Sequence, residues 1–301
     1  MLVCHGAVQN SSYKDRRGVR KRHNKLDGER RLAAGSKDAE CFLACDPSAA
    51  FVGELNGKPI CCGTMTKYGD SFAFGGCYIV SKEYRGKAYG RMIYDAGMAS
   101  VKPSRSIAIS GLLQLEELYK RKGFRSQFYG ARFDFHLPTA MTRFSEISAK
   151  CSVEIKCIEE VNLEALFVYD TTVFGFERHA FLSKWLRSTG SHAWVAIDSD
   201  GSIVGYTVAR PTFVKEEGYK IGPLFADSEA VAEKLLKAVF EELLQEQPAP
   251  VVCIDAPTKA AAEMGEKLQG KRSFEQVYMV MNDLPDACFD KWLGITTLEL
   301  G

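Results

Sequence analysis

One stretch of this sequence that could do chemistry is Arg85-Gly86-Lys87-Ala88-Tyr89-Gly90. It follows an apolar run at residues 71–80 that is typical of a strand, and it opens an expected helix at about 88–100. The first amide N–H groups of a helix have no partner within it, and together with the helix dipole they attract anions. Small residues let a phosphate approach the backbone, and Arg85 and Lys87 add positive charge. The loop therefore predicts a phosphate-binding site.

Two common phosphate motifs do not fit this loop. The P-loop pattern GxxxxGK[ST] is absent, and the dinucleotide pattern GxGxxG fails because Gly86 and Gly90 are four residues apart. On spacing alone, an ordinary strand–helix connection also remains open.

A second motif lies further along, where Tyr119 is followed by Gly123-Phe124 at the end of an expected helix. The two motifs together resemble those of the GNAT superfamily, the GCN5-related N-acetyltransferases. Arg85, Ala88 and Gly90 match its (Arg/Gln)-x-x-(Gly/Ala)-x-(Gly/Ala) loop, and the later stretch is similar to its Tyr-x-x-x-Gly-Phe helix end. The resemblance covers about residues 38–136.

The resemblance implies an acyl-CoA, most simply acetyl-CoA, as the acyl donor. It also implies a bulge in the preceding strand, within residues 77–80, whose amides hold the pantetheine and polarise the thioester carbonyl. Tyr119 would be the general acid, because a phenol with a pKa of about 10 can protonate a departing thiolate. The implied cofactor-binding residues are Tyr78, Ile79, Val80, Arg85, Gly86, Lys87, Ala88, Tyr89 and Gly90.

The general base is left open by the sequence. Asp170 is the tentative choice, as a base or as a contact to the acceptor, and Asp70, Glu54 and Glu177 are further candidates. Direct attack by an amine that is already neutral, with the help of a water chain, is another possibility.

The chain repeats one order of elements. In the first half, Asn56-Gly57 between apolar runs predicts a hairpin, and Gly75 and Gly76 within the next strand indicate a bulge or a close approach of something to the backbone. Each half runs hairpin, strand, helix, strand, helix. We therefore expect an α/β fold with tandem GNAT-like domains, each a twisted mixed sheet flanked by helices.

The second half resembles the partner domain of a two-domain GNAT subfamily through residues 170–178 and 218–227. It carries no Arg-x-x-Gly-x-Gly loop at the corresponding position. We therefore expect it to have lost acyl-CoA binding and to shape the acceptor pocket. Within the first half, Leu112 stands where the family often has an asparagine that contacts CoA.

The predicted divisions are a basic, disordered or atypical segment at 1–37, an acyl-CoA-binding domain at 38–136, a linker at 137–149 and a degenerate domain at 150–301. Residues 13–32 hold nine Lys/Arg against three acidic residues, which is typical of a solvated arm. A nucleic-acid tether is a weaker interpretation, because the arm has few aromatic residues for base stacking.

Composition limits the remaining functions. A net charge of +1 gives no overall attraction to nucleic acid or membrane, and no run of eighteen apolar residues is present. The ten cysteines form no CxxC pair and no zinc-finger spacing, which favours free thiols in a cytoplasmic protein without a metal.

The sequence thus predicts an N-acyltransferase that moves an acetyl group from acetyl-CoA to an amine in a ternary complex. The acceptor is left open among small amines, amino acids, aminoglycosides and protein lysines, and oligomeric state is not indicated. The alternative is a catalytically silent acyl-CoA-binding sensor or regulatory module.

Overall fold

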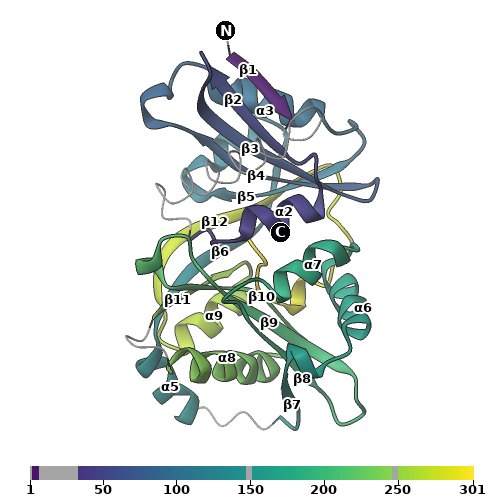
Figure 1. Cartoon of the computed structure of the whole chain (residues 1–301), viewed down its shortest axis with the longest axis vertical. Coiled ribbons are helices and arrows are strands. Elements are labelled where there is room, and N and C mark those ends of the chain that lie inside the picture. The colour runs from purple at the N-terminus through teal and green to yellow at the C-terminus, as the bar shows by residue number, and fades with distance from the viewer. Residues whose placement is uncertain (1, 7–32, 147–150, 246–249) are drawn as a thin grey trace.

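The protein is described here by a computed structural model that covers residues 2–6, 33–146, 151–245 and 250–301. Within these residues, the strands join in a single mixed sheet that runs the length of the molecule (Figure 1). The strand order is β1-β2-β3-β4-β5-β12-β6-β11-β10-β9-β8-β7, with β13 paired to β10. The expectation of tandem mixed sheets flanked by helices is confirmed.

The first half supplies one lobe of the molecule. Its hairpin turns at Asn56 and Gly57, whose positive φ values of 52° and 74° suit a tight two-residue turn. Its elements are β1 (Leu2–Gly6), α2 (Asp38–Cys45), β2 (Ala50–Leu55), β3 (Lys58–Tyr68), β4 (Phe72–Val80), η1 (Lys82–Tyr84), α3 (Tyr89–Ala99), β5 (Ser106–Leu112), η2 (Leu113–Leu115), α4 (Glu116–Lys120) and β6 (Arg125–His136).

The second half supplies the other lobe, in which α8 buries a continuous apolar face against the sheet. Its elements are α5 (Leu137–Glu146), β7 (Glu154–Cys157), η3 (Ile158–Glu160), α6 (Leu163–Phe174), α7 (His179–Leu186), β8 (His192–Ile197), β9 (Ile203–Pro211), η4 (Lys215–Glu217), β10 (Tyr219–Ala226), α8 (Glu229–Leu243), β11 (Val251–Ala256), α9 (Lys259–Lys267), β12 (Lys271–Met281), η5 (Phe289–Lys291) and β13 (Trp292–Gly294).

The structure describes parts of two of the expected segments in detail. Residues 2–6 belong to a strand that pairs antiparallel with β2, so they are not part of a disordered arm; residues 7–32 lie outside the described residues. The expected linker is helical over α5, because Leu137, Ala140 and Phe144 share one buried face, where Phe144 contacts Phe240 of α8. Residues 292–294 pair with β10 as β13.

The two halves exchange strands at the middle of the sheet. β12, from the second half, pairs with β5 on one side and with β6 on the other, both antiparallel. β6, from the first half, continues into the second lobe by pairing with β11. The halves that are consecutive in sequence are therefore interleaved in space, and the chain trace returns to the junction at its last residues (Figure 1).

Buried ion pairs lie close to this junction. Arg132 of β6 forms a two-pronged contact with Asp255 of β11, at 2.7 and 2.9 Å, and Lys220 of β10 reaches the same carboxylate at 2.6 Å. Arg210 of β9 holds Asp38 of α2 in the same two-pronged manner. Buried charges are tolerated when they are paired in this way, and these pairs connect elements of both halves.

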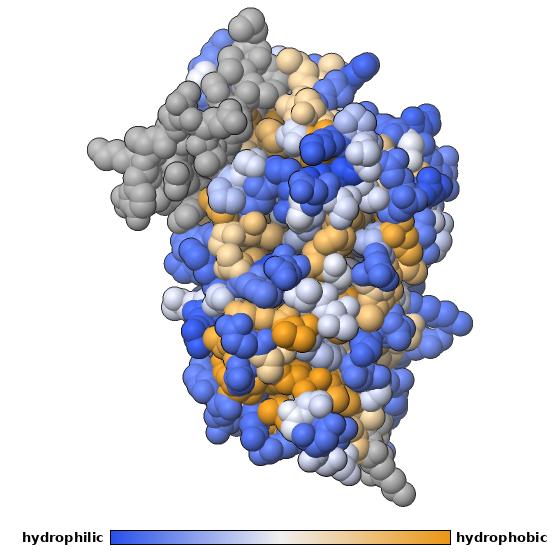
Figure 2. Space-filling model, turned by 90° about the vertical axis from the view of Figure 1, so that its right-hand side faces the viewer, coloured by the Kyte–Doolittle hydropathy of each residue, from blue (hydrophilic) through white to orange (hydrophobic). Residues whose placement is uncertain are grey.

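The face of the molecule in Figure 2 is largely hydrophilic. Figure 2 views the side that carries α6 and α7, where a hydrophobic area lies over the lower lobe among charged and polar surface. Among the described residues, no helix is long and apolar enough to cross a membrane.

Candidate active site

The strands β4 and β5 separate where the candidate site lies. They pair in parallel only from Phe72 to Gly75 and from Ser106 to Ile109. On the other edge of β4, the register with β3 shifts so that two residues, Cys77 and Tyr78, lie opposite one. This is a β-bulge, and Cys77 adopts a φ of 49° within it. The bulge expected within residues 77–80 is confirmed, and it turns the backbone of β4 away from β5.

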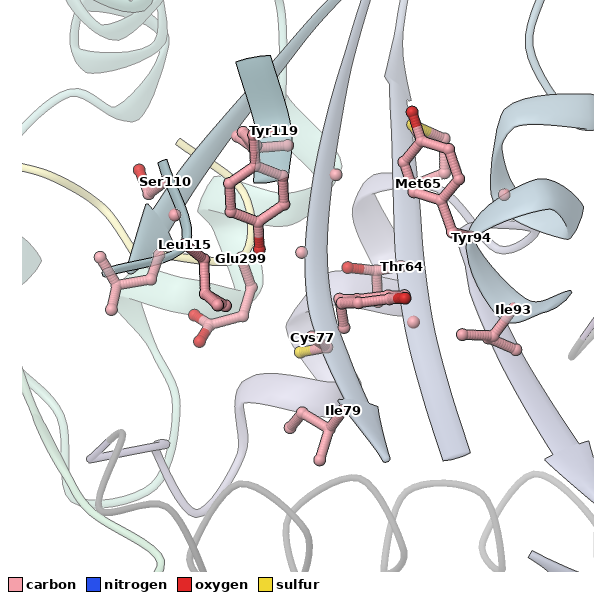
Figure 3. Close-up of a pocket in the computed structure, with 18 of the residues that line it drawn as sticks. Thr64, Met65, Cys77, Ile79, Ile93, Tyr94, Ser110, Leu115, Tyr119 and Glu299 are labelled. Atoms are coloured by element: carbon pink, nitrogen blue, oxygen red, sulfur yellow. The ribbon is translucent and has the colours of Figure 1, made fainter. Parts of the chain in front are cut away.

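A cavity of about 130 Å³ occupies this separation. Tyr78 and Ile79 line it from the bulged strand, Tyr94 from α3 and Tyr119 from α4 (Figure 3). Burial, together with the neighbouring Tyr119, raises the pKa of Tyr78 to about 12, so its phenol stays protonated at neutral pH. The cavity is therefore open to backbone groups of β4 that lack a strand partner on the β5 side.

The predicted phosphate loop leads into α3 as expected. Ala88 occupies the N-cap position with a φ of 63° and makes no side-chain hydrogen bond to the helix, so it does not cap the first amides. Gly86 also has a positive φ, of 75°. At Gly90 an added Cβ would lie 2.6 Å from the Tyr78 hydroxyl, so a larger residue there would require the Tyr78 side chain to shift. The Arg85 Nε donates to the Val80 carbonyl at 2.9 Å and holds the loop against β4.

Tyr119 is positioned by the second motif. Gly123 has a φ of 97°, which turns the chain back so that the Phe124 N–H donates to the Tyr119 carbonyl at 3.2 Å. The two rings meet edge to face, with centroids 6.2 Å apart. On its other side the Tyr119 ring fills the space beside Gly111, where a Cβ would lie 2.7 Å from Cε2. In Figure 3 the Tyr119 hydroxyl points into the cavity.

Asp170 does not lie in this cavity. Its side chain is fully buried and accepts hydrogen bonds from Arg178 Nε and Nη2, at 2.9 and 2.7 Å, and from the Tyr206 hydroxyl. Protonating it would break a buried ion pair, so its surroundings fit a structural role and not that of a base. Asp70 is 97% exposed beside Arg105, and Glu177 is exposed. None of these candidates, nor Glu54, lines the cavity.

Sequence reasoning missed the carboxylate that does line the cavity. Glu299 is 5% exposed and lines the cavity together with Tyr119 (Figure 3). Its backbone lies so close to Gly76 that an added Cβ would be 2.6 Å from the Glu299 Cα. The glycine in the middle of β4 was the available signal, since it indicated a close approach without showing which residue approaches.

Thr64 of β3 is a second polar side chain on the same face. Its neighbours Gly63 and Met65 lie against Ile93 and Gly97 of α3, so by strand alternation Thr64 faces the other way, toward the second half. It lines the cavity and is 7% exposed, and its Oγ1 has no hydrogen-bond partner within the described residues. Leaving such a group unsatisfied costs about 1–3 kcal/mol.

The second half contains a similar separation of strands, but it is filled. β10 and β11 pair in parallel only from Tyr219 to Ile221, and β13 then pairs with β10 beyond that point. The backbone of residues 295–296 passes so close to Gly222 that an added Cβ would be 2.4 Å from the Thr296 oxygen. The helix that follows, α8, is capped by its own Ser228, whose Oγ accepts from the Val231 N–H.

Comparisons with known proteins relate both halves of the chain to one family. Residues 20–124 match the model of the acetyltransferase (GNAT) family, and residues 166–287 match an acetyltransferase (GNAT) domain model. The first match begins inside the basic segment that the sequence analysis set apart. Holothin acyltransferase of Pseudoalteromonas sp. (strain SANK 73390) is 29% identical over 270 residues, covering 89% of this chain and 86% of that protein.

Two solved structures share the fold over nearly the whole chain. A putative acetyltransferase from Pyrococcus horikoshii has a TM-score of 0.73 at 18% identity, covering 100% of this chain and 96% of its own. A tandem GNAT protein from the clavulanic acid biosynthesis pathway has a TM-score of 0.65 at 14% identity, covering 93% and 97%. With an open, bulged strand pair in one half and a filled one in the other, the chain belongs to the GNAT acyltransferase superfamily and carries two GNAT domains.

Proposed function

We propose that this protein transfers an acetyl group from acetyl-CoA to the amine of a small-molecule acceptor, by direct attack in a ternary complex. The observation that carries the proposal is that the bulge of β4 and Tyr119 line one cavity, while Gly90, at the uncapped start of α3, lies against the hydroxyl of the cavity residue Tyr78. The amides at the start of α3 and in the loop 85–90 would hold the pyrophosphate, with Arg85 and Lys87 adding charge.

The bulged strand would supply the oxyanion stabilisation. Backbone groups of Tyr78, Ile79 and Val80 lie beyond the last β4–β5 pair, where N–H groups can donate to the thioester oxygen as it gains negative charge. Tyr119 would then protonate the departing CoA thiolate, since its hydroxyl points into the same cavity.

A small acceptor is favoured over a protein lysine by the surroundings of the cavity. Phe274 of β12, Leu298 and Glu299, all from the second half, close its far side. The named relatives support the same choice, since one is a holothin acyltransferase and another belongs to a clavulanic acid biosynthesis pathway. Holothin is accordingly the first acceptor to test.

The test is thiol release from acetyl-CoA with holothin, 2-phenylethylamine and hydroxylamine, beside calorimetric titration of acetyl-CoA. We expect binding and turnover by the wild type, and for Tyr119→Phe unchanged binding with kcat lowered by about 10²–10⁴. Tyr129→Phe, an exposed tyrosine of β6 outside the cavity, is the matched control. Acetyl-CoA binding without turnover of any amine in a broad panel would favour the sensor alternative instead.

A further inference from the structure

The cavity has two faces, and the second has no role in the mechanism described so far. One face, toward α3 and α4, carries Tyr78 and Tyr119. The other face, toward the second half, carries Glu299 and Thr64. Thr64 and Gly76 are paired in register across β3 and β4, so the missing Cβ of Gly76 is what lets Glu299 lie beside Thr64.

We propose that Glu299 accepts the proton that the acceptor amine must lose, and that the Thr64 hydroxyl positions that amine by a hydrogen bond. This inference rests on the proposed function and assigns the acceptor side of the same site. Thr64 Oγ1 is a buried hydroxyl without a partner within the described residues, and such groups are rare unless a ligand or water completes them.

Both ionisable and cationic side chains lie around Glu299. Tyr119 of α4 and Cys77 of β4 face it across the cavity, and both are neutral when protonated. Arg132 of β6 and Arg210 of β9 lie within electrostatic reach of its carboxylate. Asp255 is shared between Arg132 and Lys220, so two buried cations share one carboxylate on this side of the molecule.

The transfer then balances in atoms and protons. The ammonium gives one proton to the Glu299 carboxylate, and the neutral nitrogen attacks the thioester carbon to form the C–N bond. The C–S bond breaks as the oxyanion collapses, and the CoA sulfur takes the Tyr119 proton. A second proton then passes from the nitrogen to the Tyr119 oxygen and restores its hydroxyl. Glu299 releases its proton to solvent. The products are an amide, CoA thiol and one proton.

The proposal is tested with two acceptors that differ in charge. 2-Phenylethylamine is protonated at neutral pH and needs a base, whereas hydroxylamine is uncharged and does not. For Glu299→Gln we expect kcat/KM to fall about 10²–10⁴-fold with 2-phenylethylamine and to stay within about threefold with hydroxylamine. The loss with 2-phenylethylamine should shrink as the pH rises, because the amine then deprotonates in solution.

Controls separate this role from a structural one. Glu299→Gln should bind acetyl-CoA as the wild type does, and Glu299→Asp should recover at least tenfold of the lost rate. Glu233→Gln, a change at another buried glutamate that does not line the cavity, should have no effect on kcat/KM. Equal losses with both acceptors, or no loss with either, would overturn the assignment of Glu299.

Thr64→Val gives an independent measurement that does not depend on the folding of Glu299 variants. Removing an unsatisfied buried hydroxyl should leave the unfolding midpoint unchanged or higher, yet raise KM for the amine about 3–10-fold with kcat nearly constant. Thr207→Val is the matched control, because the Thr207 hydroxyl in β9 is equally buried and unpartnered but lies outside the cavity. An unchanged KM for Thr64→Val would overturn its positioning role.

A failure of the proposed function itself is distinguishable from these outcomes. In that case the wild type acetylates neither acceptor, whatever residue stands at position 299. If the wild type does acetylate them, the two-acceptor comparison alone decides the role of Glu299.

Discussion

The two separated strand pairs of this molecule show how one fold can be used in two ways. In the first half, β4 and β5 part around a cavity, and the start of α3 is left without a side-chain cap. In the second half, β10 and β11 part in the same way, but β13 fills the gap and Ser228 caps α8. The difference teaches that the groups that would bind a ligand in one half are satisfied by the chain itself in the other.

This comparison predicts that mutations in the filled strand pair and mutations in the open strand pair have different effects. Changes in the filled pair should lower the free energy of unfolding and leave acyl-CoA affinity unchanged. Changes in the open pair should lower affinity or rate with little effect on stability. The predictions below test that division, beginning with the largest expected effect.

Trp292→Ala in β13 should be the most damaging change to the filled pair. Trp292 is buried, stacks on Phe174 and Phe225, and donates its Nε1 hydrogen to the Val173 carbonyl at 3.0 Å. We expect a loss of about 3–5 kcal/mol in the free energy of unfolding, measured by urea denaturation. The dissociation constant for acetyl-CoA, measured on the folded fraction, should stay within about twofold. A variant of full stability that no longer binds acetyl-CoA would break the comparison.

Asp255→Asn should have a comparable effect that depends on pH. Burial alone would raise the pKa of Asp255, but Arg132 and Lys220 outweigh it and hold the pKa well below its usual value. The carboxylate therefore stabilises the fold fully above the unfolded pKa of about 3.9, and this contribution is lost as the pH falls below that value toward the lower folded pKa.

For this variant we expect a loss of about 3–5 kcal/mol at pH 7, because two buried cations lose their shared partner. The difference from the wild type should shrink when denaturation is repeated below pH 4. Asp70→Asn, at an exposed carboxylate, is the control and should change little at any pH. A constant difference across the pH range would contradict the role given to the carboxylate.

Ser228→Ala is the mildest of these changes and the sharpest for the comparison of the two helix starts. It removes the cap of α8 and should cost about 1 kcal/mol of stability. Acetyl-CoA affinity should be unaffected, since α8 is not expected to bind it. The corresponding change at α3 is Ala88→Ser, in the loop that we propose as the pyrophosphate site. For this variant we expect weaker binding of acetyl-CoA, measured by titration. Weaker acetyl-CoA binding by Ser228→Ala, with unchanged binding by Ala88→Ser, would instead assign the binding site to the second half.

Local signals were enough to predict the bulge, the loop before α3 and the turn after α4. The loop 85–90 and the Gly123-Phe124 turn are formed by residues that are close in sequence, so the spacing of these residues was enough to predict their geometry. The hairpin at Asn56-Gly57 was predictable for the same reason. Pro138 lies in the first turn of α5, where proline is well tolerated, so its presence did not exclude a helix in the expected linker.

The acceptor side could not be predicted, because it is made by residues far apart in sequence. Glu299 meets Gly76 only after β12 has entered the first sheet, and no periodicity near residue 299 shows this. Asp170 was only a tentative candidate for the base or for an acceptor contact. Its partners Arg178 and Tyr206 come together only in the packed core, and they account for the charge without any catalytic role.

The strand exchange has a consequence for how the protein is made. β5 and β6 are close in sequence, but β12 must lie between them, and β12 begins only at Lys271. During synthesis, the first half therefore emerges with two open strand edges that no residue before 271 can fill. Open edges of this kind favour association between chains, and contacts of such long sequence separation form slowly. Translation that pauses before residue 271, or removal of the residues beyond it, should therefore give aggregates and not an isolated acyl-CoA-binding domain.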